Sequence, residues 1–131
     1  MADRAQKILV AGGEEHILEM LELYLGKEGF EVSTAHDSVS ALDKFQAEEP
    51  DLVVLDSALD RSGLEVLRSI RSGSSVPVIM FAAYGDQDEK EAGLELGADE
   101  MVSKPFRPRD LVLRVKTQLR RSRLERATNE G

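Results

Sequence analysis

The sequence predicts an α/β protein built on a doubly wound sheet of five parallel strands, with helices on both faces. Short apolar runs alternate with stretches of helical periodicity along the chain, and the joints between them are short and polar. Three of the runs are almost continuously apolar, as strands covered on both faces should be. Regular alternation of strand and helix favours parallel strands joined by right-handed crossovers.

Five apolar runs are predicted to be strands. They are KILVA (7–11), FEVSTA (30–35), DLVVLD (51–56), VPVIMFAA (76–83) and EMVSK (100–104). In a sheet of this kind, functional side chains gather at the carboxyl ends of the strands. The segments to search for chemistry are therefore 11–15, 56–63, 81–86 and 102–106.

Five helices are predicted to connect and follow these strands. Apolar residues recur at helical spacing from about 14 to 28 and from 38 to 48, where Ser38 is a possible N-cap. A third helix follows Gly63, and a fourth, in the segment DQDEKEAGLELGA (86–98), stops near Gly97. The fifth begins after Pro108.

The length and composition indicate one soluble globular domain. The chain has 131 residues, of which 41% are hydrophobic and 32% charged. We expect a single domain over residues 1–126 and a flexible C-terminal tail over 127–131. No apolar run approaches the roughly 20 residues that a membrane helix needs, and the N-terminus is too polar for a secretory signal. With no cysteine for disulfides or thiolate metal sites, these features favour a cytoplasmic protein without membrane contact.

Charge is divided unevenly along the chain. Residues 1–103 carry 8 Lys and Arg against 22 Asp and Glu, whereas residues 104–126 carry 9 against 2. A basic tail could bind nucleic acid, but this one lacks interleaved aromatic residues and a second helix for a helix-turn-helix. We expect solvated helix faces here, and nucleic-acid binding remains a second alternative.

The pair Gly12-Gly13 ends the first predicted strand and is a candidate phosphate loop. Nucleotide-binding loops need further glycines at set spacing, or a lysine and a hydroxyl residue, and the chain has none of these there. Glu14 and Glu15 are expected in the first turn of the following helix, where they would repel an incoming phosphate. The glycine pair therefore does not predict a nucleotide site.

Asp56 and Lys104 end or follow strands and are expected to point into one crevice. A strand-end carboxylate can accept a phosphoryl group if a cation holds the phosphate oxygens and a lysine neutralises the developing charge. The same two residues could equally form a partly buried ion pair that fixes the last loop. Their spacing leaves both interpretations open.

The order of three motifs resembles the receiver domain of two-component response regulators over about residues 7–120. The motifs are PDLVVLD (50–56), GLELGADE (93–100) and KPF (104–106). The resemblance implies a flavodoxin-like sheet in the order 2-1-3-4-5. It also implies that Asp56 is the position phosphorylated by a sensor histidine kinase, that Lys104 binds the phosphate, and that the carbonyl of Ala58 is a Mg²⁺ ligand.

The chain departs from the family pattern at several of its functional positions. The acidic pair that holds Mg²⁺ falls on Gly12 and Gly13, the hydroxyl that meets the phosphoryl group falls on Ala82, and the switch aromatic falls on Met101. The loop SALDRSG after Asp56 is one residue shorter than usual and lacks the usual proline. The glycines therefore indicate a vacated metal site, and no cofactor is expected.

Few residues could restore a metal site. Mg²⁺ is usually held by one or two carboxylates together with the phosphates themselves. Glu14, Asp56 and Ala58 are the remaining candidate ligands, and Glu14 is more often simply a first-turn acid. Mg²⁺ belongs to the alternative in which the domain accepts phosphate. His16 and His36 are expected to be surface residues.

The sequence therefore predicts an atypical receiver, or pseudo-receiver, that is not an enzyme and acts through protein–protein interaction. The alternative is a working phosphoprotein that accepts phosphate on Asp56 from a histidine kinase. The expected partner is a histidine kinase or a downstream effector. A homodimer through residues 86–121 is also possible, since the acids Asp88, Glu89, Glu91 and Glu95 would complement Arg114, Lys116 and Arg120.

Overall fold

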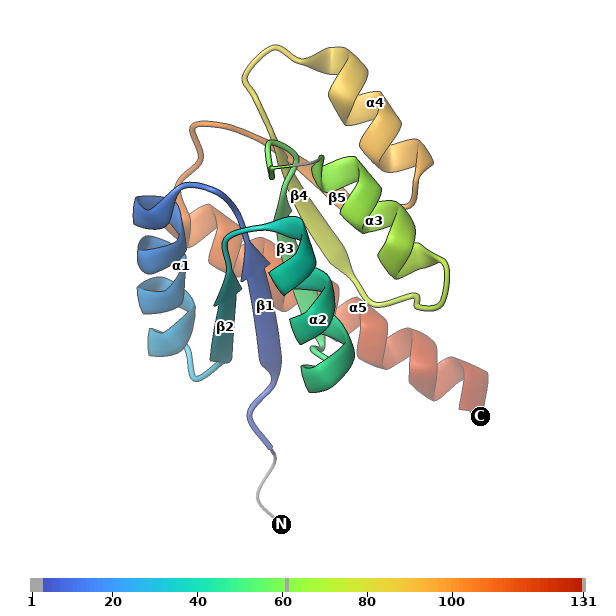
Figure 1. Cartoon of the computed structure of the whole chain (residues 1–131). Coiled ribbons are helices and arrows are strands. Elements are labelled where there is room, and N and C mark those ends of the chain that lie inside the picture. Colours follow the sequence, from blue (N-terminus) through green and yellow to red (C-terminus); the bar gives the residue numbers. More distant parts are fainter. Residues whose placement is uncertain (1–3, 61, 131) are drawn as a thin grey trace.

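The fold is a single parallel sheet of five strands in the order β2-β1-β3-β4-β5, as Figure 1 shows. The computed structural model describes residues 4–60 and 62–130, the last five of these as backbone only. The strands are β1 (Lys7–Ala11), β2 (Glu31–Ala35), β3 (Leu52–Asp56), β4 (Val78–Ala82) and β5 (Glu100–Ser103). The predicted fold class and strand order are confirmed.

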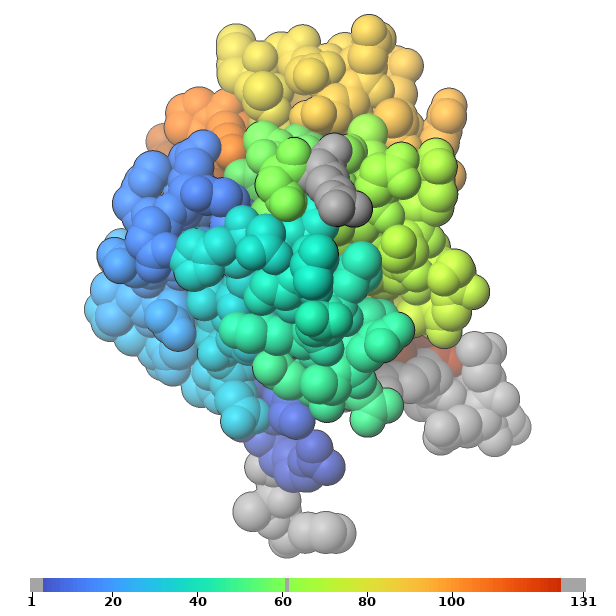
Figure 2. Space-filling model, in the orientation of Figure 1, coloured from blue at the N-terminus to red at the C-terminus, as the bar shows by residue number. Residues whose placement is uncertain are grey.

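Five helices cover the two faces of the sheet. They are α1 (Glu15–Lys27), α2 (Ser38–Glu48), α3 (Gly63–Arg71), α4 (Gln87–Glu95) and α5 (Pro108–Glu130). Helices α1 and α5 lie on one face, and α2, α3 and α4 lie on the other (Figure 1). In the view of Figure 2, the surfaces of α2 and α3 close over the front of the sheet.

The central strands are apolar except at Lys7, which begins β1, and Asp56, which ends β3, because both of their faces are covered. In β1, Ile8 and Val10 join the cluster under α1 and α5, whereas Leu9 and Ala11 join the cluster under α2 and α3. Successive strand residues point to opposite faces, so a strand between two helical layers is apolar at nearly every position. The same division continues in β3, where every residue is buried.

Element boundaries agree with the sequence prediction to within a few residues, with one changed cap. Asp37, and not Ser38, is the N-cap of α2, and its carboxylate accepts the Ser40 N–H at 2.7 Å. Ser38 is the first helical residue, and its hydroxyl donates to Asp60 Oδ1 at 2.7 Å. Both residue types cap helices well, so local sequence alone did not distinguish them. The fourth helix does stop near Gly97, whose φ of +107° favours glycine.

Helix α5 is the longest element and extends past the sheet at the carboxyl end of the chain (Figure 1). Its backbone is helical through Glu130, while residue 131 and the side chains of 126–130 lie outside the description. The expected domain boundary at 126 and the flexibility of 127–131 remain predictions. Among the described residues, no helix combines the length and apolar character needed to cross a membrane.

Candidate functional site

The site lies at the carboxyl ends of β1, β3 and β4 and is centred on Asp56. Asp56 is the last residue of β3, and its side chain is 5% exposed. Lys104 follows β5, two strands away, and its backbone N–H donates to the carbonyl of Ala82 at the end of β4. From there Lys104 Nζ reaches Asp56 Oδ2 at 2.6 Å. The expected meeting of the two side chains is confirmed, and in this structure they form a partly buried ion pair.

Both carboxylate oxygens of Asp56 are occupied. Oδ2 accepts from Lys104, and Oδ1 accepts the backbone N–H of Ala58 at 2.9 Å. A buried carboxylate is costly unless its oxygens are hydrogen-bonded and its charge is paired. These contacts meet both needs within the chain, without a metal.

Glu14 is the second acid at the site. From the sequence, Glu14 is expected in the first turn of the helix that follows β1, but the structure places it one residue earlier, as the N-cap of α1. Its side chain makes no capping hydrogen bond. Its Oε1 lies 3.4 Å from Lys104 Nζ. Partial burial of Lys104 opposes its charge, but the hydrogen bonds and charges of Asp56 and Glu14 outweigh that effect and raise the pKa of Lys104 above its ordinary value.

Gly12 and Gly13 lie beside Asp56 at the end of β1. A Cβ atom built on Gly12 would sit 3.8 Å from Asp56 Oδ2 and 3.5 Å from Asp56 Cβ, which are ordinary contact distances. A Cβ on Gly13 would meet nothing within 4 Å. The backbone therefore accepts a Cβ atom at both positions without a clash, so close packing does not require glycine at either of them.

The residues present do not fit a Mg²⁺ ion. Magnesium requires near-octahedral oxygen ligation, usually with one or two carboxylates. The one buried carboxylate is engaged by Lys104 and Ala58, and Glu14 also faces Lys104. Across the residues whose side chains are described, 4–60 and 62–125, no group of three or more His, Cys, Asp or Glu side chains is arranged to hold a metal.

The two positions expected at the family's switch are apolar and packed. Ala82 is fully buried at the end of β4 and has no hydroxyl to offer. Met101, in β5, packs beneath α4, where a Cβ on Gly93 would come within 2.4 Å of its sulfur atom. Gly93 thus allows the thioether to fill the space under α4, a contact that sequence periodicity did not reveal.

The loop that follows Asp56 is held on both sides by contacts that the sequence did not predict. The Ser57 hydroxyl donates to the carboxylate of Glu89 in α4, and Asp60 accepts from both the N–H and the hydroxyl of Ser38 in α2. Asp86 caps α4 by accepting the Glu89 N–H at 3.0 Å, which leaves the Glu89 side chain to reach the loop. The spacing of Asp86 and Glu89 resembles a capping box, so a signal for this arrangement exists in the sequence. Arg61, in the same loop, lies outside the described residues.

Gly63 permits the close approach of α3 to the site. A Cβ there would lie 2.3 Å from the Asp56 carbonyl oxygen and 2.6 Å from Ser57 Cα. Both are backbone atoms that cannot move aside without distorting the strand end. A glycine at the start of α3 is therefore required by packing, not by an unusual backbone angle.

The two histidines lie at the surface next to glutamates. His16 is 3.6 Å from Glu14, and its side chain is 80% exposed. His36 pairs with Glu15, and its side chain is 53% exposed. The expected surface placement is confirmed, although each histidine has a carboxylate neighbour that linear spacing did not predict.

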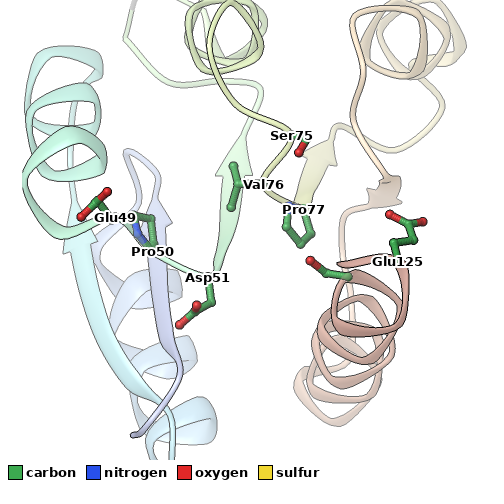
Figure 3. Close-up of a pocket in the computed structure, with 8 residues that line it drawn as sticks. Glu49, Pro50, Asp51, Ser75, Val76, Pro77 and Glu125 are labelled. Carbon is green, nitrogen blue, oxygen red and sulfur yellow. The ribbon is translucent and has the colours of Figure 1, made fainter. Parts of the chain in front are cut away.

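Another pocket lies at the opposite edge of the sheet and is separate from this site. Figure 3 shows it between the turn before β3, the turn before β4, and α5, with Glu49, Asp51 and Glu125 among its lining residues. Asp51 Oδ2 accepts the backbone N–H of Lys7 at 2.7 Å. Because this pocket borders the amino ends of the strands, none of its lining residues belongs to the site formed by Asp56, Lys104 and Glu14.

The bases expected to complement α4 are partly committed elsewhere. Arg114 pairs with Glu100 and with Asp110, whose Oδ2 lies 3.2 Å from its Nε. Lys116 pairs with Glu28 at the end of α1, so it faces α1 and not α4. A dimer through residues 86–121 remains a prediction, with weaker support from charge than the sequence suggested.

The strand order, the strand-end acid and the lysine beyond β5 define the class of protein. A family model for the response regulator receiver domain matches residues 8–116. The chain belongs to this family and is a signal-transduction domain. Receiver domains bind Mg²⁺ for phosphorylation and interact with histidine kinases and effectors.

Solved structures of other receiver proteins are similar over nearly the whole chain. A CheY-like receiver domain protein from Methanospirillum hungatei is 29% identical with a TM-score of 0.88, and the match covers 93% of this chain and 99% of that one. NtrX from Brucella abortus, in complex with ADP, is 33% identical with a TM-score of 0.88, over 97% of this chain but 29% of NtrX. The receiver domain of the Francisella response regulator 1452 is 27% identical with a TM-score of 0.84, covering 89% of this chain and 98% of that chain.

Proposed function

We propose that this protein is an atypical receiver domain that signals through protein–protein interaction and not through ordinary Mg²⁺-dependent phosphorylation of Asp56. The observation that carries the proposal is the state of Asp56 itself. Its two oxygens are held by Lys104 and by the Ala58 N–H, beside a β1 end that offers two glycines. In this proposal the ion pair is the working state of the site, and no cofactor is required.

The missing groups would slow phosphoryl transfer strongly. A phosphoryl group entering the site would add negative charge beside Asp56, with Lys104 as the compensating cation at hand. Loss of one group that stabilises charge in a transition state typically costs on the order of 10²–10³ in rate. Here the two acids that would hold the metal and the hydroxyl at Ala82 are all absent. Asp56 remains the phospho-acceptor position by resemblance, and Lys104 the phosphate-binding one.

One observation favours the alternative of a working phospho-receiver. The Glu14 carboxylate points at Lys104 Nζ and does not cap α1. If Lys104 shifted its contact from Asp56 to Glu14, one oxygen of Asp56 would become available to a phosphodonor or a cation. A histidine kinase would then be the partner, and Mg²⁺ or another cation would be the cofactor.

The signalling surface that we propose is the face formed by α4, β5 and α5. Ser57 hydrogen-bonds Glu89 of α4, so a change in the conformation of the loop after Asp56 would alter a contact of that helix. On α4, Leu94 is 53% exposed and is flanked by the exposed acids Glu91 and Glu95. A protein partner with an apolar contact and basic neighbours would fit this surface. We propose a cytoplasmic location and no enzymatic activity.

Nucleic-acid binding is the least supported alternative. The exposed side of α5 alternates bases with Leu113 and Leu124, which are 63% and 61% exposed, and carries no aromatic residue. Stacking on bases requires aromatic side chains, and phosphate contacts give a steep salt dependence. We expect no measurable duplex binding at physiological salt, and binding that falls steeply as salt rises would support this alternative.

Incubation with acetyl phosphate and millimolar Mg²⁺, followed by intact mass measurement, tests the proposal. We expect little stable adduct on the unaltered chain. The variant Gly12→Asp/Gly13→Asp should gain a phosphoryl adduct, because it restores the two acids of the family pattern at positions where a Cβ atom meets no clash. The further variant Gly12→Asp/Gly13→Asp/Asp56→Asn is the matched control and should lose it. Rapid modification of the unaltered chain at Asp56, abolished by Glu14→Gln, would establish the alternative.

A further inference from the structure

Two methionines lie side by side on the sheet face that α4 covers. Met80 of β4 and Met101 of β5 are direct neighbours in the parallel register of the two strands. Both side chains belong to the apolar cluster under α2, α3 and α4. Met80 is fully buried, whereas Met101 is partly buried and lies on β5, the edge strand of the sheet. The two thioethers therefore share one environment but differ in their access to solvent.

Gly93 is the part of α4 that packs on these thioethers. All nine residues of α4 are described, and Gly93 is the buried one among them. A Cβ atom on Gly93 would lie 3.5 Å from the sulfur of Met80 and 2.9 Å from Cε of Met101, and it would lie closer still to the Met101 sulfur. Glycine inside a helix lowers helix stability, and here it leaves the space that the Met101 thioether fills. The seat of α4 on the sheet therefore depends on one apolar sulfur atom.

Polar contacts hold the two ends of α4. At its start, Asp86 caps the helix and the Glu89 carboxylate accepts from Ser57. Just past its end, Arg71 Nε donates to the Gly97 carbonyl at 2.9 Å. Segments with few buried apolar contacts open locally at a lower free energy than the rest of a domain. Loss of the apolar contact in the middle should therefore loosen α4 without unfolding the protein.

We propose that Met101 is an oxidation site, through which a hydroperoxide loosens α4. The lone pair of the thioether sulfur attacks one peroxide oxygen and the O–O bond breaks. With hydrogen peroxide, the proton left on the transferred oxygen moves to the departing hydroxide, so that peroxide is reduced to water while the sulfur is oxidised by two electrons to the sulfoxide. Methionine sulfoxide is reduced back to methionine by dedicated reductases, so the change is reversible.

A sulfoxide at Met101 is incompatible with the present packing of α4. Oxidation converts a flexible apolar side chain into a polar one and disrupts methionine-rich contacts. The Met101 sulfur is bordered by Gly93 and by the neighbouring Met80. The added oxygen must enter this apolar contact or turn the side chain outward, and both outcomes remove the filling beneath α4.

The oxidation requires no chemistry at Asp56. It rests on the proposed function only for the part that α4 then plays, because α4 belongs to the signalling surface that we propose. The loosening of α4 is measured on the chain itself, without a partner or a phosphodonor. The variant Asp56→Asn should respond to peroxide as the unaltered chain does, so failure of this inference and failure of the proposed function are distinguishable.

Peptide mapping by mass spectrometry after exposure to dilute hydrogen peroxide tests the site. In the folded chain, Met101 should gain one oxygen, a mass increase of about 16 Da, well before Met80 does. In concentrated urea the two methionines should react at the same rate, because burial no longer separates them. No early gain at Met101, or an equal early gain at Met80 in the folded chain, would overturn the proposal.

Hydrogen–deuterium exchange measures the consequence for the helix. Amides of α4 (87–95) should exchange about tenfold faster after oxidation, because a polar group placed in an apolar contact destabilises it. Amides of α2 (38–48) should be unchanged. Treatment with methionine sulfoxide reductases for both epimers should restore slow exchange in α4.

Two variants separate Met101 from other effects of peroxide. Met101→Leu conserves the apolar volume without the reactive sulfur, so its α4 should not respond to peroxide. Met20→Leu, in α1, is the matched control and should respond as the unaltered chain does. Unchanged α4 exchange in a chain oxidised at Met101, or an equal rise in Met101→Leu, would overturn the proposal.

Discussion

Removal of Lys104 while Asp56 remains should destabilise the protein more than removal of Asp56 itself. The substitution Lys104→Met leaves a carboxylate that is 5% exposed, with the Ala58 N–H as its remaining hydrogen bond in the structure. Breaking a buried ion pair by removing one partner typically costs about 3–5 kcal/mol. Because the Lys104 side chain is 21% exposed and water can enter in its place, we expect the lower end, about 3 kcal/mol.

The expected loss is large enough to measure by thermal unfolding. An unfolding entropy of about 2.1 cal/mol/K per residue converts 3 kcal/mol into a fall in Tm of roughly 11 °C for a chain of this length. Asp56→Asn should cost less, because Lys104 can turn to Glu14, whose Oε1 is already 3.4 Å away. The double variant Asp56→Asn/Lys104→Met should recover much of the loss, since it leaves no buried charge unpaired.

Circular dichroism melts of the four proteins complete a double-mutant cycle. A coupling free energy near zero, or a Lys104→Met variant as stable as the unaltered chain, would show that the ion pair does not hold the site together. The reasoning from buried charge would then be wrong.

Two further perturbations follow from the geometry of the site. Gly63→Ala should prevent normal folding or lower the Tm by more than 10 °C, because its Cβ would lie 2.3 Å from the Asp56 carbonyl oxygen. The control is Gly73→Ala, where the added Cβ meets nothing within 4 Å and the Tm should change by only a few degrees. If Gly63→Ala and Gly73→Ala had the same Tm, close packing at Gly63 would not be the reason for its glycine. Because folding raises the pKa of Lys104, the free energy of unfolding should depend on pH in the alkaline range. The stabilisation from charged Lys104 is fully present below the ordinary lysine pKa of about 10.4, and it is lost as the pH rises through the higher pKa of the folded state. In urea unfolding from pH 8 to 11.5, the stability advantage of the unaltered chain over Lys104→Met should shrink only above about pH 10.4, and a constant advantage would refute the linkage.

The spacing of apolar residues predicted the fold, because each strand and helix has a recognisable periodicity and is bounded by short polar segments. Strands buried on both faces appear in the sequence as continuous apolar runs. The order of the strands in the sheet was predicted from the family resemblance, because periodicity alone does not determine strand order. The choice between Asp37 and Ser38 as the α2 N-cap depended on Asp60, which is distant in sequence and binds Ser38.

The strand-end positions of Asp56 and Lys104 indicated that their side chains could meet, and the structure brings them together. The sequence alone left open whether they form an ion pair or a phosphoryl site, and the absence of acids at Gly12 and Gly13 is the basis of our proposal for the ion pair. The orientation of Glu14 toward Lys104 results from the way α1 enters the fold. The contact of Ser57 with Glu89 joins residues 32 positions apart, and the periodicity of apolar residues within one element cannot predict such a contact.

Calorimetric titration of the chain with Mg²⁺ near pH 7.5 tests the central claim most directly. The account predicts no binding at millimolar Mg²⁺ and no change in Tm, because a ligand stabilises a protein only by binding its native state. The variant Gly12→Asp/Gly13→Asp should bind Mg²⁺ and gain a Tm that rises with its concentration, and adding Asp56→Asn to that variant should weaken both effects. Saturable Mg²⁺ binding to the unaltered chain, with a rise in Tm that Asp56→Asn abolishes, would contradict the account.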